Sequence, residues 1–386
     1  MNTGLNEMAN IVKKVDDIRN ELNGYFLERG EEINILLNAV ISQKHVFLLG
    51  VAGTAKSMLC RAVVSHIEGA KFFDWLMTSY TVPDEIFGAL DISKLEQGKY
   101  ERIITGKLPD VEFAFLDEIF KANSSILNAL LKIINERLFD NDAQPIAVPL
   151  VSLFSASNEL PDSDENLTAL YDRLHFRKLV KPISEQSNEE KLLKLDKKYY
   201  PKTKITFEEL DKLHQSAMNI SIDEVIGDLI KIFRTLKSNG IFISDRRKLE
   251  CRDILKANAL INGNTKEVTT EDLTILQHVL WNEPQEIQHA TSTVLKISNP
   301  FEEKAKEFMA MLDDLETKAQ KYTELTEDVY EIYTKFTNIQ KTVENLIEQA
   351  EKLGKPTKVL KEVENRVSGI MRKMRKEYWG IGSGGE

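Results

Sequence analysis

The residues Gly50-Val51-Ala52-Gly53-Thr54-Ala55-Lys56-Ser57 decide the fold of this chain. They follow the apolar run His45–Leu49 and precede MLCRAVVSHI, whose apolar residues have helical spacing. A strand, a glycine-containing loop and a helix in this order are the setting of a P-loop, in which successive backbone N–H groups bind phosphate oxygens. The helix that follows offers its N-terminus to the same anion. We expect Lys56 to reach the β- and γ-phosphates of a nucleotide and Ser57 to hold Mg²⁺.

One residue departs from the P-loop pattern, because Ala55 stands where a second glycine normally lies. We expect the loop to tolerate this alanine because residue 55 keeps helical φ and ψ angles, which alanine adopts easily at the start of a helix. The alternative interpretation of the whole stretch is a glycine turn between a strand and a helix, followed by an ordinary lysine.

Two adjacent carboxylates, Asp117 and Glu118, end the apolar run Phe113–Leu116. At the carboxyl edge of a parallel sheet, such a pair lies beside the phosphate loop. We expect Asp117 to hold Mg²⁺ through its water shell and Glu118 to orient and deprotonate the attacking water. The alternative is a solvated strand end without a catalytic role.

Other polar residues are candidates for contacts with the γ-phosphate. Asn158 follows a third predicted strand, Val148–Ala156, and could bind the γ-phosphate or position the water; alternatively it opens the turn before Pro161. An arginine directed at a γ-phosphate stabilises the charge of the transition state. The candidates, each of which is by default a solvated charge, are Arg173, Arg177, Arg246 and Arg247.

Composition indicates a globular, intracellular protein. Of the 386 residues, 42% are apolar and 29% are charged, and the net charge of -10 argues against duplex DNA or an anionic membrane as the main partner. The two cysteines, Cys60 and Cys251, do not form a disulfide scaffold, so we expect a reducing cytoplasm. The amphipathic, charged N-terminus has no apolar h-region, so we expect no signal peptide there, and no run of 18 apolar residues could span a bilayer.

The chain divides into zones with different patterns. Residues 1–180 alternate short apolar runs with helical segments, as in a parallel sheet covered by helices, and residues 181–300 are mostly helical. An apolar stripe from Phe308 to Leu353 predicts one long helix, which Gly354-Lys355-Pro356 ends. We expect it to fold back on a shorter helix, giving a helical hairpin or coiled coil over residues 301–379. Residues 380–386 are predicted to be a flexible tail.

Together these segments resemble the MoxR family of AAA+ ATPases, most closely its RavA-like branch. The resemblance extends from about Gly30 to Pro284 and rests on GVAGTAKS, FAFLDEIFKANSSILNALLKIINERLF, FSASNELP, the YDRL segment and ISDRR. Alanine is common in this family at the position of Ala55. The resemblance implies an α/β core with a helical lid, and ATP and Mg²⁺ bound between the protomers of a hexameric ring. RavA-like proteins carry a β-containing appendage, whereas residues 301–379 show only helical periodicity.

The resemblance also implies roles for individual residues. Asn158 looks like sensor 1, Arg173 like the arginine finger offered to a neighbouring subunit, and Arg246 like the sensor 2 arginine of the lid. Arg177 and Arg247 remain rival candidates, because a one-turn misreading would exchange them.

Two insertions of the family face the ring axis. Here they would fall within Asp84–Lys107, the helix-2 insert, and Leu138–Pro149, a pre-sensor hairpin in which Asp140-Asn141-Asp142 suits the turn. The alternative is a pair of ordinary surface loops.

The leading hypothesis is a ring ATPase that remodels or activates a protein partner. By resemblance that partner carries a von Willebrand factor A domain. A nucleic-acid-translocating motor is an alternative, but opposite charges nearly cancel within Asp84–Lys107. A nucleotide-dependent switch or scaffold acting through its C-terminal helices is another, against which the intact Glu118 argues.

Overall fold

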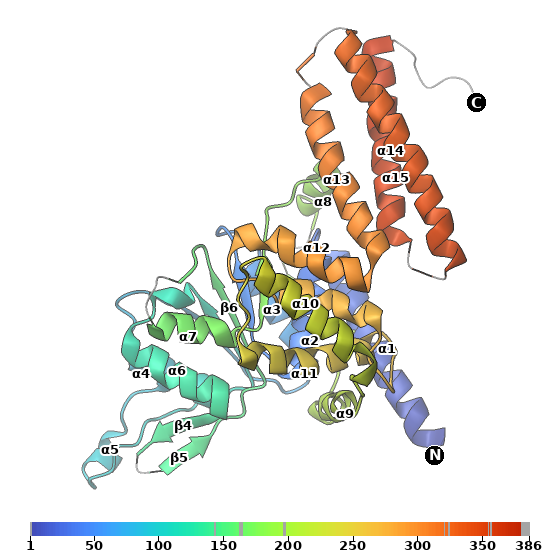
Figure 1. Cartoon of the computed structure of the whole chain (residues 1–386). Coiled ribbons are helices and arrows are strands. Elements are labelled where there is room, and N and C mark those ends of the chain that lie inside the picture. Colours follow the sequence, from blue (N-terminus) through green and yellow to red (C-terminus); the bar gives the residue numbers. More distant parts are fainter. Residues whose placement is uncertain are drawn as a thin grey trace. The chain divides into compact units, whose positions relative to one another are not determined.

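We describe the fold from a computed structural model (Figure 1). The structure describes residues 2–142, 144–161, 165–195, 198–319, 321–322, 325–353, 355 and 357–379, with only the backbone for residues 2–6. The chain forms two compact units, one up to Ala290 and one from Thr291 onward. Within the described ranges, the helices lack the unbroken apolar length that a membrane span requires.

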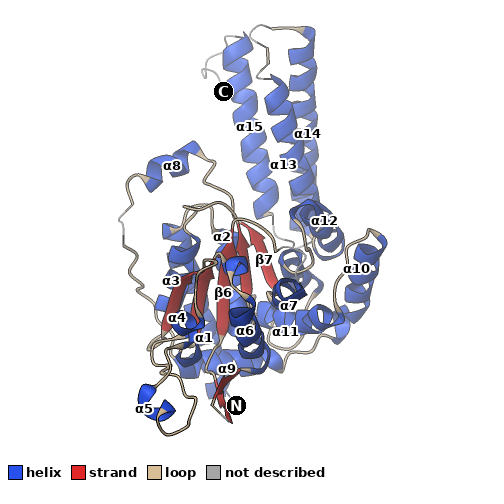
Figure 2. Ribbon diagram, turned by 90° about the vertical axis from the view of Figure 1, so that its left-hand side faces the viewer, coloured by secondary structure: helices blue, strands red, loops and turns tan. Residues whose placement is uncertain are grey.

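The first unit is built on a five-stranded parallel sheet, which Figure 2 shows between layers of helices. Its strands are β1 (Val46–Leu49), β2 (Phe72–Leu76), β3 (Phe113–Asp117), β6 (Ser152–Ser157) and β7 (Phe176–Leu179), in the order β2-β3-β6-β1-β7. Every residue of β1 and β6 is buried, as expected for central strands of a parallel sheet covered on both faces. The three predicted strands are therefore confirmed, whereas β2 and β7 were not predicted.

Helices cover this sheet and continue into a helical lid. The longer helices of the first unit are α1 (Asn2–Tyr25), α2 (Gly30–Ser42), α3 (Lys56–Ser65), α6 (Ser124–Glu136), α7 (Glu165–Arg173), α8 (Gln186–Leu192), α9 (Phe207–Met218), α10 (Ile226–Ser238) and α11 (Asp245–Ile261). In the lid, α11 packs against α9 and also against α2 of the sheet layer. The predicted α/β core with an all-α lid is confirmed, and the boundary between them at residue 180 stays a prediction.

Two excursions leave the sheet next to each other. The first contains the short helices α4 (Pro83–Phe87) and α5 (Ile92–Leu95), and the second is the antiparallel hairpin of β4 (Leu138–Asn141) and β5 (Gln144–Ala147) (Figure 1). The hairpin predicted within Leu138–Pro149 is thus confirmed. Its turn holds the first excursion, since the side chains of Asn141 and Asp142 each accept a 2.7 Å hydrogen bond from a backbone N–H, of Arg102 and Tyr100 respectively.

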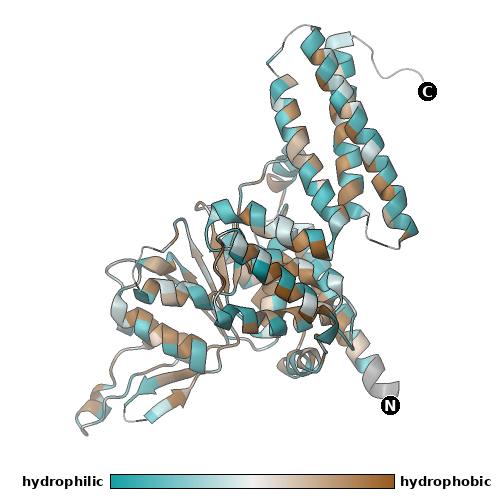
Figure 3. Cartoon of the chain, in the orientation of Figure 1, coloured by the Kyte–Doolittle hydropathy of each residue, from teal (hydrophilic) through white to brown (hydrophobic). Residues whose placement is uncertain are grey.

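The C-terminal unit contains a bundle of three helices where the sequence predicted a hairpin of two. After α12 (Ile287–Ser298), three helices pack on one another: α13 (Pro300–Ala319), α14 (Glu327–Lys352) and α15 (Lys358–Trp379). Figure 3 shows hydrophobic residues recurring along each of the three, and their buried members form one core. The stripe that predicted one long helix therefore belongs to two helices. Gly354, Pro356 and residues 380–386, on which the predicted break and tail fall, lie outside the described residues.

Candidate active site

The carboxyl edge of the sheet brings the predicted phosphate loop and the acidic pair together. Leu49, the last residue of β1, pairs with Ser157, the last residue of β6, and Gly50 N donates to Ser157 O at 3.0 Å. On its other side β6 pairs with β3, which ends at Asp117. Because the strands are parallel, Gly50, Asp117 and Asn158 all lie at strand ends on one edge of the sheet.

The loop backbone has the shape that phosphate binding needs, and it depends on glycine at its first position. A Cβ atom on Gly50 would lie 2.4 Å from the carbonyl oxygen of Val180, which follows β7, so no other residue fits there. Further along, Gly53 has a φ of +82°. Positive φ angles in such a loop turn successive N–H groups toward one concave side, where an anion can bind.

Ala55 adopts a conformation that the sequence analysis did not predict. Its φ of +64° and ψ of 21° are left-handed, not the helical angles that we expected at the start of a helix. The expected right-handed angles of Ala55 are therefore wrong. The chain must turn by a left-handed residue to enter α3, which is why glycine is usual there, and alanine adopts the same angles at a steric cost of about 1–2 kcal/mol.

Lys56 lies at the centre of the loop. Its Nζ donates to the carbonyl oxygens of Gly50 at 2.7 Å and Val51 at 2.9 Å, and the residue is buried. Burial lowers the pKa of the Lys56 ammonium, while the nearby carboxylates of Asp117 and Glu118 act in the opposite direction. The loop lysine and both acids thus lie within electrostatic reach of one another.

Glu118 is held in an unusual position directly after β3. Its φ is +52°, and its N–H donates to Oδ1 of Asp117 at 3.1 Å. Its Oε2 forms an ion pair with Nζ of Lys121, 3.3 Å away. Within the described residues this buried oxygen has no hydrogen-bond partner. Such a carboxylate oxygen is free to accept a proton or a hydrogen bond from a water molecule.

The remaining predicted residues of this edge flank the loop. Ser57, in the first turn of α3, is half-buried, and Asn158 is exposed just beyond β6. The Thr54 hydroxyl donates to Val51 O at 3.0 Å and so fixes the loop from within. These positions leave the side chains of Ser57 and Asn158 accessible to a ligand on the loop.

A cavity of about 530 Å³ adjoins the loop and was missed by the sequence analysis. Besides residues of the loop, three separate segments line it: Tyr25–Leu27 with Arg29, then Pro182–Ile183, and the side chains Glu189, Leu192 and Leu195 at or near α8. Its size and partly apolar lining suit the base and sugar of a nucleotide. No local motif marks these residues, because they meet only in the folded chain.

Two of the four candidate arginines are structural. Arg177 is fully buried and donates to four carbonyl or amide oxygens: Tyr171 O at 2.8 Å, Leu174 O at 3.2 Å, Trp281 O at 2.6 Å and Asn282 Oδ1 at 3.0 Å. Burial, followed by the charge of Arg247, lowers its pKa to about 9. Arg247, also buried, donates to Asp172 Oδ1 at 2.9 Å and to Asn282 Oδ1 at 2.8 Å. Both guanidinium groups therefore join the lid to the sheet layer.

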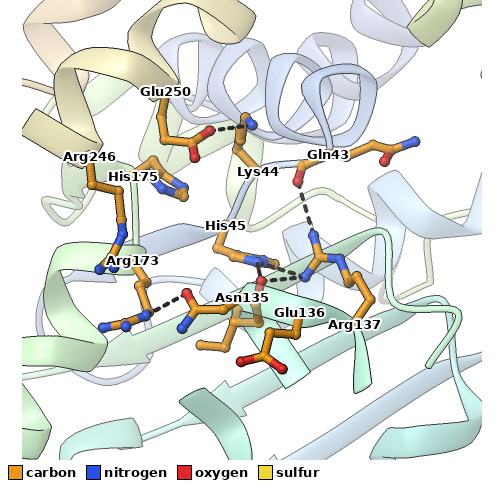
Figure 4. Close-up of a pocket in the computed structure, with 11 residues that line it drawn as sticks. Gln43, Lys44, His45, Asn135, Glu136, Arg137, Arg173, His175, Arg246 and Glu250 are labelled. Carbon is orange, nitrogen blue, oxygen red and sulfur yellow. Dashed lines mark hydrogen bonds and ion pairs between the residues drawn. The ribbon is translucent and has the colours of Figure 1, made fainter. Parts of the chain in front are cut away.

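The other two arginines share a second cavity, shown in Figure 4. Arg173 Nε donates to Asn135 Oδ1 at 2.5 Å, and NH1 donates to Ala169 O at 2.6 Å. Arg246, about half exposed, lies 4.0 Å from Asp172. The same cavity is lined by residues 43–45, which precede β1, so it opens at the amino edge of the sheet, opposite the P-loop.

The residues of the carboxyl edge fit a nucleoside triphosphate with Mg²⁺. The loop forms a concave backbone surface that a Cβ atom at Gly50 would disrupt. The ammonium group of Lys56 lies against the carbonyl oxygen of Gly50 in this loop. The hydroxyl of Ser57 and the carboxylate of Asp117 are oxygen ligands of the kind that Mg²⁺ prefers. These residues define the class of protein: a P-loop nucleotide-binding protein of the AAA+ type, with a helical lid.

Comparisons with known proteins agree with this class. Residues 13–215 match the family described as the MoxR domain in the MoxR-vWA-beta-propeller ternary systems, and residues 224–294 match the AAA lid domain. A crystal structure of a candidate ATPase from Cytophaga hutchinsonii has the same fold, with a TM-score of 0.62 at 16% identity, covering 77% of this chain and 98% of that one. The chain belongs to the MoxR family of AAA+ ATPases.

Relatives by sequence include two uncharacterised proteins of Methanocaldococcus jannaschii. One is 45% identical over 312 residues, 81% of each chain, and the other 47% identical over 302 residues, 78% of this chain and 80% of the relative. A structural protein of Acidianus two-tailed virus is 30% identical over 185 residues, which are 47% of this chain and 30% of the viral protein. The similarity to the archaeal proteins extends well beyond the nucleotide-binding motifs.

Proposed function

We propose that the chain hydrolyses ATP with Mg²⁺ as a subunit of a homo-hexameric ring, and that the ring remodels or activates a protein partner. The observation that carries the proposal is the buried Glu118 carboxylate oxygen without a hydrogen-bond partner among the described residues, next to Lys56 and Asp117. A loop that only binds nucleotide does not require a carboxylate oxygen without a hydrogen bond there, and the ion pair of this oxygen with Lys121 keeps the carboxylate charged.

Each residue of the carboxyl edge has a part in this reaction. Lys56 exchanges its bonds to the Gly50 and Val51 carbonyls for the β- and γ-phosphates, which a flexible ammonium can do without moving the loop. Glu118 orients the attacking water and accepts its proton, and Asn158 contacts the γ-phosphate from the end of β6. Mg²⁺, held by Ser57 and Asp117, would neutralise charge that develops on the phosphate oxygens.

The position of the two accessible arginines supports a shared site. Arg173 and Arg246 line a cavity at the amino edge of the sheet, whereas the P-loop is at the carboxyl edge. The four residues of β1 alone separate these edges by about 13 Å. We therefore assign Arg173, the finger, and Arg246, the sensor 2 residue, to the nucleotide of a neighbouring subunit, which requires a head-to-tail interface of the kind that closes into rings.

The partner is proposed from the family. The matching family is described by its occurrence with vWA and β-propeller proteins, which supports a partner with a von Willebrand factor A domain. The two excursions that contain α5 and the β4–β5 hairpin would face the ring axis. Assignment to the RavA-like branch and a cytoplasmic location stay predictions from the sequence.

A nucleic-acid motor is less well supported. Arg102, the arginine of the first excursion, donates to Asp84 Oδ1 at 2.5 Å and to Gly88 O at 2.6 Å. The lysines Lys94 and Lys99 each lie 3.9 Å from Glu101. Cations that are already paired do not form a basic track for a phosphate backbone.

The proposal is tested by ATP hydrolysis per chain, measured as the protein concentration rises. We expect specific activity to increase with concentration, because the site is complete only between subunits, and we expect Glu118→Gln to lower turnover by about 10²–10⁴-fold while nucleotide still binds. Glu112→Gln, at the other end of β3, is the matched control. Concentration-independent turnover, or a Glu118→Gln protein as active as wild type, would refute the proposal and favour a nucleotide-dependent switch or scaffold.

A further inference from the structure

The cavity that Arg173 and Arg246 line has an excess of positive charge. It measures about 530 Å³, and four cationic side chains line it against two carboxylates, Glu136 and Glu250. One cation, Lys44, is neutralised locally by ion pairs with Glu250 and Asp253. The remaining three cations are the arginines Arg137, Arg173 and Arg246.

These three arginines have few opposite charges nearby. Arg137 donates only to neutral groups, among them Gln43 O at 3.1 Å and Val151 O at 3.2 Å, and burial lowers its pKa to about 10. Arg173 also donates to neutral oxygens, and after burial the neighbouring charge of Arg246 is the main influence that lowers its pKa. Of these three arginines, only Arg246 has a carboxylate of the described residues within 4.0 Å, that of Asp172. The cavity therefore holds more positive than negative charge, and its partly exposed guanidinium groups of Arg173 and Arg246 can be reached by an anion from solvent.

His175 provides an independent indication of a ligand. Its exposed fraction is only 7%, yet neither ring nitrogen has a hydrogen-bond partner among the described residues. Buried polar groups are nearly always hydrogen-bonded, so a buried imidazole with two unused nitrogens needs an explanation. Figure 4 shows this ring in the same cavity as Arg173 and Arg246. A ligand in the cavity that both accepts and donates a hydrogen bond would satisfy the two nitrogens.

We propose that this cavity is a second oxyanion site of the chain, one that takes a phosphate group, with Arg173, Arg246 and His175 as the residues that contact it. Guanidinium groups bind phosphate oxygens through paired, charge-assisted hydrogen bonds, which a single tetrahedral anion can accept from two arginines at once. A neutral imidazole has one N–H to donate to a further oxygen and one nitrogen that accepts from a protonated phosphate oxygen.

The phosphate group has two possible sources. It is either free inorganic phosphate or the terminal phosphate of a nucleotide bound to the P-loop of a second copy. Only the nucleotide as source rests on the proposed function. In both cases the new assignment is His175, which no nucleotide-binding motif includes. The experiment therefore reads His175 directly and does not depend on turnover.

The first test titrates inorganic phosphate into the full-length Lys56→Ala protein, with its histidines labelled with ¹⁵N, and follows the imidazole signals by NMR. Lys56→Ala weakens phosphate binding at the P-loop, and His175→Asn identifies the His175 signals. We expect the His175 signals to move with saturation, and Arg173→Gln to weaken the binding about tenfold or more while those signals persist. Arg173 is partly exposed, so that variant is expected to fold even where His175→Asn does not.

The second test distinguishes the sources. Labelled Lys56→Ala protein is mixed with unlabelled Glu118→Gln protein and ATP, at an ATP concentration that saturates the Glu118→Gln protein but not the weakened Lys56→Ala P-loop. Movement of the His175 signals in this mixture, but not with free phosphate, identifies the nucleotide of a neighbour, and movement with phosphate alone identifies an independent site. If the His175 signals move in neither experiment, or move equally in Arg173→Gln, the second oxyanion site is wrong, whereas ATP turnover by the wild type would remain a separate result.

Discussion

The carboxylate of Asp172, near the end of α7, accepts a hydrogen bond of 2.9 Å from the buried guanidinium of Arg247, in the first turn of α11. The Ser244 hydroxyl, which caps α11, donates to the same carboxylate. Asp172 precedes Arg173 in the chain and Arg247 follows Arg246. This ion pair between the sheet layer and the lid therefore fixes the spacing of the two arginines that share the second cavity.

Removing this ion pair is expected to destabilise the chain. Asp172→Asn leaves the buried Arg247 without its charged partner, so we predict a decrease of about 1–3 kcal/mol in the free energy of unfolding. Urea unfolding at neutral pH measures the change. Asp245→Asn, two residues before Arg247, is the matched control; it removes only an exposed ion pair with Lys248 and should lower stability much less than Asp172→Asn does. Equal effects of the two substitutions would show that the Asp172 ion pair contributes nothing to stability.

The left-handed backbone of Ala55 predicts that replacing this alanine by glycine stabilises the protein. Ala55→Gly relieves the steric cost of a positive φ, and the greater freedom of glycine in the unfolded chain offsets only part of this gain. We expect the free energy of unfolding to rise by about 0.5–1 kcal/mol. Ala62→Gly, within the same helix α3, should instead lower it by about 1 kcal/mol. If Ala55→Gly destabilises the protein as Ala62→Gly does, residue 55 has right-handed helical angles after all.

Stability is expected to decrease below about pH 6.5. Burial lowers the pKa of both His45 and His175 well below 6.5, so both stay neutral in the folded chain where the unfolded chain already binds protons. The free energy of unfolding is therefore highest above the pKa that these histidines have in the unfolded chain. Below that pKa it falls as the pH decreases, by up to about 1.4 kcal/mol per pH unit for each histidine. Urea unfolding across this range measures the slope, and His175→Gln should reduce it by the share of one histidine. A slope that His175→Gln leaves unchanged would mean that His175 titrates alike in both states.

Much of the nucleotide site could be predicted because it depends on short-range sequence. Gly50 directly follows β1, Asp117 ends β3 and Glu118 follows it, and the register of a parallel sheet places the ends of those strands side by side. Strand β2 was missed because its residues Phe72–Leu76 are only partly buried and mix apolar with charged side chains. Strand β7 was missed because a buried arginine, Arg177, interrupts its apolar pattern.

Other errors have physical causes that a closer reading of the sequence could find. The break between α13 and α14 contains neither glycine nor proline, the residues on which the prediction of helix ends relied. Thr326 nevertheless caps α14 by accepting from Val329 N, and Glu327 and Asp328 follow it in the first turn. A threonine followed by two acids is a typical helix start.

The choice between rival arginines could not be made from sequence. Arg173 and Arg177 are four residues apart, and Arg246 and Arg247 are adjacent in the chain. Only burial and hydrogen-bond partners distinguish the buried from the accessible residue of each pair. The same holds for the cavity beside the P-loop, whose lining segments meet only through the fold. Roles that depend on contacts across the sheet are therefore beyond a single sequence.

The most direct test of a nucleotide site shared between subunits is to mix two inactive variants. Glu118→Gln keeps Arg173, and Arg173→Ala keeps Glu118, so an interface between the two variants can contain both residues. We predict that an equal mixture hydrolyses ATP well above the summed rates of the separate variants, at about one quarter of the wild-type rate for random head-to-tail pairing. A mixture no more active than the separate variants would contradict the shared site.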